Sequence, residues 1–414
     1  MSRGTVRRVV RPLLIVTAST LALVLTLEVG LRVVMALRHG AGRYYLLYGA
    51  HALTGRLDIS PWSTFTGDHY KFPPNYVLRG AAGQGEETAS INSLGFRGRD
   101  FEPGKRPGVF RVVCLGESST FGFHNSDTGT YPFFLQQLLE ARSVPGGVEV
   151  INAGFPYYNT SSILSLLKTE VLGWHPDVIT LYAAFNDASW PLEIGMVTRA
   201  LLWLQQRSVI YLVLKEHVAT DRRVMAVSRW MARRFPAPFD EAALQRHVDQ
   251  VATRYRRNVI GIVSLARAAG AVVVVARQPM RAGPPGRNLT YEQEYRAVRE
   301  KIRRGGRLSS TELVLLTHRR LTDELDALAR EHDLAVVDNI AIVDAHRDHL
   351  ATYVHLSEDG NRRLAEALRE AIHPRLAGAT APARSSAGTR AAVVADQGGG
   401  SVDHRRRHPA PGLE

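Results

Sequence analysis

Residues 109–122, VFRVVCLGESSTFG, decide the fold expected of this chain. An apolar run at 112–115 ends at Gly116, and a short run bounded in this way is typical of a buried parallel strand rather than a helix. A turn containing Ser118 follows at once, and a helical pattern begins at Thr130. Open α/β sheets bind ligands where the chain leaves the carboxyl end of a strand, and backbone N–H groups there can face an oxyanion. Ser118 is therefore a candidate nucleophile, although Gly and Ser are also common in ordinary turns.

Short apolar runs alternate with amphipathic stretches along the rest of the chain. Further strands are expected at 148–151, 178–183, 271–276 and 334–338. Helices are expected at 130–142, 161–172, 241–268, 311–332 and 359–372. Strands that alternate with helices imply right-handed crossovers and a parallel sheet covered on both faces. We therefore expect a flavodoxin-like, three-layer α/β/α domain with a five-stranded parallel sheet.

Composition divides the chain into four parts. We expect a membrane anchor at 1–40, an irregular lead-in rich in Tyr, Gly, Pro and Ser at 41–108, the α/β domain at 109–376, and a disordered tail at 377–414. The α/β domain contains an insertion at 189–238 with amphipathic patterns of Trp, Leu, Ile, Tyr and Arg. This insertion is either a lid or membrane-facing flap over the site, or a set of helices that simply pack on the domain.

The N-terminal segment is expected to cross a membrane. Arginines at positions 3, 7, 8 and 11 precede an uncharged run of sixteen residues at 12–27. As a helix this run spans roughly 24 Å, and flanking arginines and further apolar residues up to 37 extend it toward the bilayer core of about 30 Å. No small-residue cleavage site follows the run, which favours an uncleaved anchor over a signal peptide; a buried soluble helix is the other alternative. The arginines favour a cytoplasmic N-terminus, so we expect a single-pass protein of the cell membrane with its α/β domain outside the cytoplasm.

The net charge of +13 raises the question of nucleic-acid binding. The arginines are scattered, with no basic stripe interleaved with aromatic residues, so nucleic acid is not an expected partner. Acidic lipids and acidic glycans are both compatible with this charge. The single cysteine, Cys114, lies inside the expected buried strand and cannot form an intramolecular disulfide, so it says nothing about the compartment.

Three polar features follow the carboxyl ends of successive strands: Ser118, Gly154 and Asn186. Parallel strand ends share one edge of the sheet, so these residues can meet there, and His355 comes just before the last helix. Acyl transfer needs a nucleophile, a base to take its proton, and donors that face the developing oxyanion. These residues would supply all three parts, although an Asn after a strand is often a turn residue and a lone histidine is often on the surface.

These residues resemble the motifs of the SGNH hydrolases, also called GDSL-type esterases and acylhydrolases, over roughly residues 90–375. The matching segments are Gly116-Glu117-Ser118, Asn152-Ala153-Gly154, Asn186-Asp187, His355 with Gly360, and the lead-in NSLGFRG at 92–98, which is similar to a bacterial branch with an N-terminal membrane helix. The resemblance implies that Ser118 is the nucleophile and His355 the base. It implies an oxyanion hole formed by the Ser118 and Gly154 amides and the Asn186 side chain.

Three positions depart from the family pattern. Glu117 replaces the usual Asp, Ala184 stands where Gly is usual, and Thr352 stands where the family has an Asp three residues before its histidine. That Asp would orient the imidazole and stabilise the imidazolium. Asp348 is the first candidate to replace it, and the alternatives are Asp344, Asp338 and a backbone carbonyl.

We therefore expect a serine-dependent ester hydrolase, an acyl or acetyl esterase, acting outside the cytoplasm on an ester or O-acylated glycan or lipid. One alternative is an O-acyltransferase that modifies cell-envelope polysaccharide. Another, motivated by Thr352, is a non-catalytic carbohydrate-binding protein. No cofactor is expected. No metal is expected either, because His346, His349 and His355 have spacings of three and six residues that match no common zinc pattern.

Overall fold

The computed structural model describes residues 3–39, 71–72, 74–75, 77–79, 88–141, 146–156, 158–189, 208, 210, 241–283, 286 and 288–380. The chain divides into two units, Met1–Thr380 and Ala381–Glu414, and the second lies outside the described residues. The predicted insertion at 189–238 also lies outside them, apart from residues 189, 208 and 210. The last helix continues to Thr380, so residues 377–380, predicted as part of the tail, are helical.

Five parallel strands form the central sheet, in the order β4-β3-β5-β6-β7. Their bounds are Phe110–Gly116 for β3, Val148–Gly154 for β4, Val178–Tyr182 for β5, Val272–Ala276 for β6 and Ala335–Val337 for β7. In register, Cys114 of β3 lies opposite Asn152 on one side and Thr180 on the other. The predicted flavodoxin-like fold is confirmed, with the strand quoted from the sequence at an interior position of the sheet.

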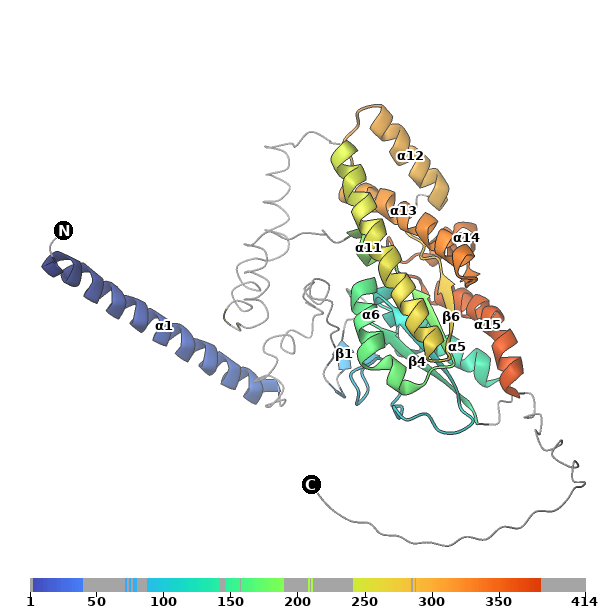
Figure 1. Cartoon of the computed structure of the whole chain (residues 1–414), viewed down its shortest axis with the longest axis horizontal. Helices are drawn as coiled ribbons and strands as arrows, with labels where there is room; N and C mark the ends of the chain where they lie inside the picture. The colour runs from blue at the N-terminus through green and yellow to red at the C-terminus, as the bar shows by residue number, and fades with distance from the viewer. Residues whose placement is uncertain are drawn as a thin grey trace, which may run out of the picture. The chain divides into compact units, whose positions relative to one another are not determined.

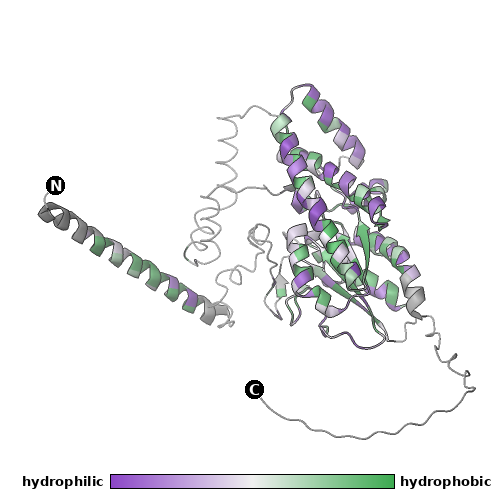
Figure 2. Cartoon of the chain, in the orientation of Figure 1, coloured by the Kyte–Doolittle hydropathy of each residue, from purple (hydrophilic) through white to green (hydrophobic). Residues whose placement is uncertain are grey.

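Helices cover both faces of the sheet (Figure 1). One face packs on α6 (Thr160–Thr169), α11 (Glu241–Ala268) and α13 (Ser310–Glu331), and the other on α5 (Tyr131–Glu140) and α15 (Glu358–Thr380). Alternate residues of β3 enter the two cores: Val113 and Leu115 join the first, Val112 and Cys114 the second. Every residue of β3 is buried for this reason, and Figure 2 shows the hydrophobic strands between mixed helices.

Among the described residues, four α-helices were not predicted, of which two, at 118–121 and 185–189, are only four and five residues long. The other two lie in the C-terminal half of the chain. The first, α12 (Tyr291–Arg303), begins with a capping box in which Thr290 and Gln293 each accept the backbone N–H of the other. Its buried residues are only Tyr291, Glu294 and Val298, so its apolar stripe is too narrow to give a clear helical period. The second, α14 (Asn339–Ala345), is only seven residues long.

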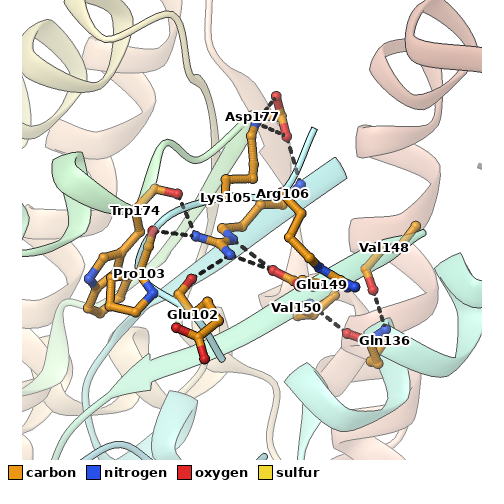
Figure 3. Close-up of polar contacts among 11 residues, drawn as sticks. Glu102, Pro103, Lys105, Arg106, Gln136, Val148, Glu149, Val150, Trp174 and Asp177 are labelled. Carbon is orange, nitrogen blue, oxygen red and sulfur yellow. Dashed lines mark hydrogen bonds and ion pairs between the residues drawn. The ribbon is translucent and has the colours of Figure 1, made fainter. Parts of the chain in front are cut away.

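The predicted irregular lead-in contains two short strands and is fastened to the domain by a buried arginine. The strands, β1 (Val77–Arg79) and β2 (Thr88–Ser90), pair antiparallel. Arg111 at the start of β3 is fully buried, and its guanidinium donates to the carbonyls of residues 102, 103 and 174 and to the Glu149 carboxylate, at 2.6–2.9 Å (Figure 3). Because all its donors are satisfied, this buried charge ties the lead-in to β4 at the amino end of the sheet.

A side chain of α5 pairs two backbone groups on the β4 edge of the sheet. In β4, the Val148 carbonyl accepts from Gln136 Nε2 at 2.9 Å, and the Val150 N–H donates to Gln136 Oε1 at 2.5 Å (Figure 3). Gln136 belongs to α5, so the helix itself pairs the edge groups that another chain could otherwise bind.

The N-terminal segment forms one continuous helix, α1, from Arg3 to His39. Its window Leu14–Val34 has 21 residues, a mean hydropathy of 2.0 and no buried share, which suffices to cross a membrane by length and composition. Within it, Glu28 and Arg32 form an ion pair at 2.9 Å one turn apart, which reduces the cost of two charges in an apolar helix. A helix of this kind near an N-terminus fits both a membrane anchor and a signal sequence.

Candidate active site

Ser118 lies on a tight turn where β3 ends. It begins a four-residue helix, α4 (Ser118–Phe121), which closes at Gly122 with φ 85°. A Cβ on Gly116 would lie 2.0 Å from Thr120 Oγ1 and 2.5 Å from the Tyr182 carbonyl, so only glycine lets α4 fold back onto the strand ends. This close packing raises the Ser118 side chain, which is partly exposed, above the carboxyl edge of the sheet.

His355 lies within hydrogen-bond distance of Ser118. It sits near the end of a hairpin that is closed by a bridge between Leu350 and Leu356 and precedes α15. Its Nε2 is 2.8 Å from Ser118 Oγ. The two residues are 237 positions apart in sequence, and the shared edge of the parallel sheet brings them together.

Thr352 itself occupies the position of the missing carboxylate. Its Oγ1 lies 2.9 Å from His355 Nδ1 and also accepts the N–H of His355 at 3.1 Å. Asp348, the predicted replacement, does not reach the imidazole: it lies in a 3-10 turn, η4 (Arg347–His349), before the hairpin. Asp344 and Asp338 are also engaged elsewhere, with the Tyr291 N–H and with Arg277.

The threonine hydroxyl can orient the imidazole but cannot stabilise its cation as a carboxylate would. For Nε2 to accept the serine proton, Nδ1 must carry its own hydrogen and donate it to Thr352 Oγ1. Burial, and to a lesser extent the neighbouring His124, lower the pKa of His355 to about 3. The imidazole is therefore neutral at physiological pH, which is the form that a general base needs.

Asn186 is buried beside the nucleophile turn. It belongs to α7 (Phe185–Ser189), directly after β5, and its backbone N–H donates to the Glu117 carboxylate at 3.1 Å. One hydrogen of its side-chain amide is held by the Tyr158 carbonyl at 2.8 Å, which leaves the second for another acceptor. The following residue, Asp187, accepts the N–H and the hydroxyl of Thr160 at 2.8 and 2.7 Å and so fixes the start of α6.

Gly154, the other predicted backbone donor of the oxyanion hole, has a hydrogen-bond partner of its own. Its N–H donates to the side-chain oxygen of Asn152 at 3.0 Å, so this donor is already engaged. A Cβ on Gly154 would lie 2.4 Å from the Phe121 N atom, which shows that glycine is needed here to let α4 approach β4. The Ser118 N–H is the first of α4 and has no partner within the helix, so it stays a predicted oxyanion donor.

Gln278, which the sequence analysis did not identify, connects three strand ends. Its Oε1 accepts the N–H groups of Ala184 and Phe185 at 2.8 and 2.7 Å, and its Nε2 donates to Glu117 at 3.3 Å and Ser119 Oγ at 3.2 Å. All four hydrogen-bonding positions of this buried amide are filled. Burial, and then the nearby Asp187, raise the pKa of Glu117 well above its ordinary value. Gln278 lies two residues past β6, so the rule that found Ser118 and Asn186 would also have found it.

Two buried arginines hold the loops that carry the site. Arg97, in the lead-in, donates to the carbonyls of Phe121, Gly122 and Asn125 at 2.8–2.9 Å and pairs with Asp127 at 3.0 Å. It therefore fixes the turn behind Ser118. Arg281 does the same for the His355 hairpin: its N–H donates to the carbonyl of residue 353 at 2.8 Å, and its guanidinium to those of 347 and 350.

Aromatic rings border the Ser118–His355 pair. The Phe123 and His124 rings lie 5.4 and 5.0 Å from the His355 ring. Tyr353, which is 48% exposed, lies 5.6 Å from the Phe185 ring. A cavity of about 460 Å³ between the lead-in, α5 and β4 contains neither Ser118 nor His355 in its lining.

Comparison with known proteins identifies the family. A family model described as GDSL-like lipase/acylhydrolase matches residues 114–363, which is more than half of the chain. Among curated proteins, none matches this sequence.

Several solved structures are similar to the chain over most of their own length. A lipase/acylhydrolase from Enterococcus faecalis has 17% identity and a TM-score of 0.39, with 64% of this chain and 96% of that chain covered. A GDSL-like lipase from Bacteroides thetaiotaomicron has 13% identity and a TM-score of 0.37, with 64% and 88% covered. A lipolytic G-D-S-L family protein from Veillonella parvula has 14% identity and a TM-score of 0.36, with 63% and 97% covered.

The family match covers the carboxyl end of β3 with its serine turn, the Asn186 segment and the His355 hairpin, all of which the fold brings to one edge of the sheet. The chain belongs to the GDSL-like lipase/acylhydrolase family of ester hydrolases.

Proposed function

We propose that this protein is a serine esterase in which Ser118 is the nucleophile and His355 the general base. The distance of 2.8 Å between Ser118 Oγ and His355 Nε2 carries the proposal. His355 takes the hydroxyl proton as Ser118 Oγ attacks the ester carbonyl, and it returns this proton to the leaving alcohol. Water then attacks the acyl-enzyme with the same histidine as base.

The developing oxyanion would be held by the Ser118 N–H and by the free hydrogen of the Asn186 amide. Both groups come from the ends of neighbouring strands, β3 and β5, and Glu117 fixes them relative to each other by accepting the Asn186 N–H. Donors fixed before the reaction stabilise the transition state without reorganisation. Gly154 has no part in this proposal, because Asn152 already accepts its N–H.

The proposed substrate is an O-acylated glycan or lipid outside the cytoplasm. Support comes from α1, which is long and apolar enough to tether the enzyme to a membrane, and from the arginines before its apolar window, which favour a cytoplasmic N-terminus. The Phe123 and His124 rings beside His355, and the exposed Tyr353 two residues before it in sequence, offer flat surfaces for a sugar ring or an acyl chain.

Labelling with a fluorophosphonate probe tests the proposal, because such a probe reacts only with an activated serine. We expect the wild-type chain and the Ser126→Ala control, an unrelated serine on the same loop, to be labelled equally, and Ser118→Ala to be unlabelled. Equal labelling of Ser118→Ala and wild type would remove Ser118 from the site. With an acetylated glycan as substrate, release of free acetate supports hydrolysis, whereas transfer of the acetyl group to an added glycan acceptor would assign a transferase.

A further inference from the structure

Three side chains with metal-binding atoms lie together just before the His355 hairpin. One ligand atom from each of His346, Asp348 and His349 lies within 4.8 Å of the other two. The imidazole rings of the two histidines are 5.1 Å apart and inclined by 32°. In the sequence these two histidines lie near His355. In the structure, however, His355 contacts Ser118, and Asp348 is the third residue near the two histidines. We propose that His346, Asp348 and His349 form a binding site for a divalent transition-metal ion of the zinc type.

The donor set defines the class of ion. Two imidazole nitrogens and one carboxylate oxygen suit zinc and its neighbours in the transition series. Calcium and magnesium are bound by oxygen ligands, so this site would discriminate against them. Three protein ligands leave the fourth position of a tetrahedral ion open to water or to an added ligand.

Within the described part of the chain, no hydrogen bond or ion pair engages the side chains of these three residues. Among the described residues Asp348 forms no ion pair, whereas the nearby Asp344 pairs with Arg347 at 3.0 Å. His349 Nδ1 is buried and has no hydrogen-bond partner. Side chains that already form other contacts would have to break them to bind an ion. His349 Nδ1 and the Asp348 carboxylate have no such contact to break among the described residues.

The backbone that carries the ligands is already fixed. The N–H of His349 donates to the carbonyl of His346 at 2.9 Å, which closes the 3-10 turn between the two histidines. The buried Arg347 anchors this turn to Asp344 and Glu294. A Cβ on Gly360 would lie 2.8 Å from the His349 carbonyl, so the first turn of α15 packs directly against this histidine. Ion binding would therefore order side chains but not the main chain.

The site stands at the base of the hairpin that presents His355. The His349 carbonyl accepts the Ser357 N–H at 2.8 Å, and the bridge between Leu350 and Leu356 follows it. A bound ion would slow the opening of this hairpin, and hydrogen exchange at its amides would report the change. An effect of the ion on catalysis would act through His355 and so rests on the proposed function. Metal binding itself does not rest on it.

Competition with a chromophoric chelator tests the site directly, using Zn²⁺ and the full-length chain without an added histidine tag. We expect the wild type to bind one zinc ion that His346→Ala and Asp348→Asn each weaken by at least about tenfold, since even loss of a second-shell contact costs that much. The control His175→Ala removes an exposed histidine elsewhere in the domain and should bind as the wild type does. Zinc should also slow hydrogen exchange at Ala351 and Ser357 in the wild type and in the His175→Ala control, and less so in the two site variants.

Two further variants separate this site from the active site. His124→Ala removes the ring next to His355, and Ser118→Ala removes the proposed nucleophile; both should bind zinc normally. Unchanged zinc binding in the double variant His346→Ala/His349→Ala, or no stoichiometric binding by the wild type, would overturn the proposal. Loss of binding only in His124→Ala would place the ion at the active site instead.

Discussion

Thr352 distinguishes this site from a triad with a carboxylate, because a hydroxyl stands beside the imidazole where an aspartate would be. A serine–histidine pair needs its imidazole in the tautomer with the hydrogen on Nδ1, and Thr352 Oγ1 is the only acceptor that the described residues place there. The same oxygen lies 3.3 and 3.1 Å from the N atoms of Val354 and His355, so it is held from the backbone side, and these two N–H groups share its two lone pairs with the Nδ1 hydrogen. It thus supplies orientation, while the charge that would stabilise an imidazolium is missing.

Thr352→Asp should therefore increase turnover and change its pH dependence. An aspartate at this distance favours the imidazolium, so it raises the pKa of His355, which is about 3 in the wild type. Because the neutral imidazole is the active form, the acid limb of kcat/KM in the wild type should lie well below pH 6.5 and move upward in the variant. We expect turnover at neutral pH to rise by about tenfold or more, a part of the roughly 10⁴-fold that loss of a triad carboxylate costs elsewhere.

Two controls accompany this variant, one that keeps the hydroxyl and one that keeps the shape of threonine. Thr352→Ser keeps the hydroxyl and should retain wild-type activity, whereas Thr352→Val removes the acceptor and should lower it. If Thr352→Val were as active as the wild type, the hydroxyl would have no role in orienting His355.

Asn186→Ala tests the oxyanion donor. We expect turnover to fall roughly 10²–10³-fold with little change in substrate binding, because this hydrogen bond forms fully only in the transition state. The variant also loses the bond to the Tyr158 carbonyl, so a decrease of about 1 kcal/mol in the free energy of unfolding should accompany the kinetic effect. Kinetics and thermal melting together decide: a destabilised variant with near-normal turnover would mean that Asn186 is only structural.

At the scale of elements, Gln278 links the loops after β3, β5 and β6. Gln278→Leu has a similar volume but leaves the Ala184 and Phe185 N–H groups without an acceptor, at a cost of about 1–3 kcal/mol for each buried group left unpaired. Because α7 carries Asn186, we expect kcat to fall while KM changes little.

Gln278→Glu is the matched variant. It keeps the acceptor but places a second carboxyl beside Glu117, so it should restore the melting temperature that Gln278→Leu loses, but only at acidic pH, where the carboxyls are protonated. A Gln278→Leu protein with normal kcat would show that the link does not position the oxyanion donor.

Sequence patterns predicted the strands and helices that are determined by the residues within the element itself. Short apolar runs such as 112–115 and 271–276 form strands of a parallel sheet that is buried on both faces, and the helical period at 241–268 predicted α11 with its observed bounds. The same reasoning missed α12, whose buried stripe is narrow, and it did not foresee that the Gly154 N–H donates to Asn152. The contact of Thr352 with His355 could not be predicted, because it depends on how the hairpin folds.

At the scale of the whole molecule, the placement of the catalytic domain depends on α1. The window Leu14–Val34 spans roughly 31 Å as a helix, which matches the bilayer core of about 30 Å. The uncharged run at 12–27 alone is too short to cross this core, but the helix continues past it and makes up the missing length. The ion pair between Glu28 and Arg32 falls near the end of this window, where both side chains can approach the interface.

We expect the full chain to stay with membranes after a carbonate wash, and a reporter that is active only outside the cytoplasm to be active when fused to the C-terminus. The physical reason is that the arginines at positions 3–11 resist translocation, while the apolar window inserts and carries the following domain across. Replacing these arginines by glutamine is the matched variant, since it leaves the hydrophobic window intact and removes only the orienting charge; it should give a mixed or inverted topology with lower reporter activity. A carbonate-soluble product whose first residue lies near position 40 would instead show that α1 is a cleaved signal sequence, and the domain would then act as a free secreted esterase.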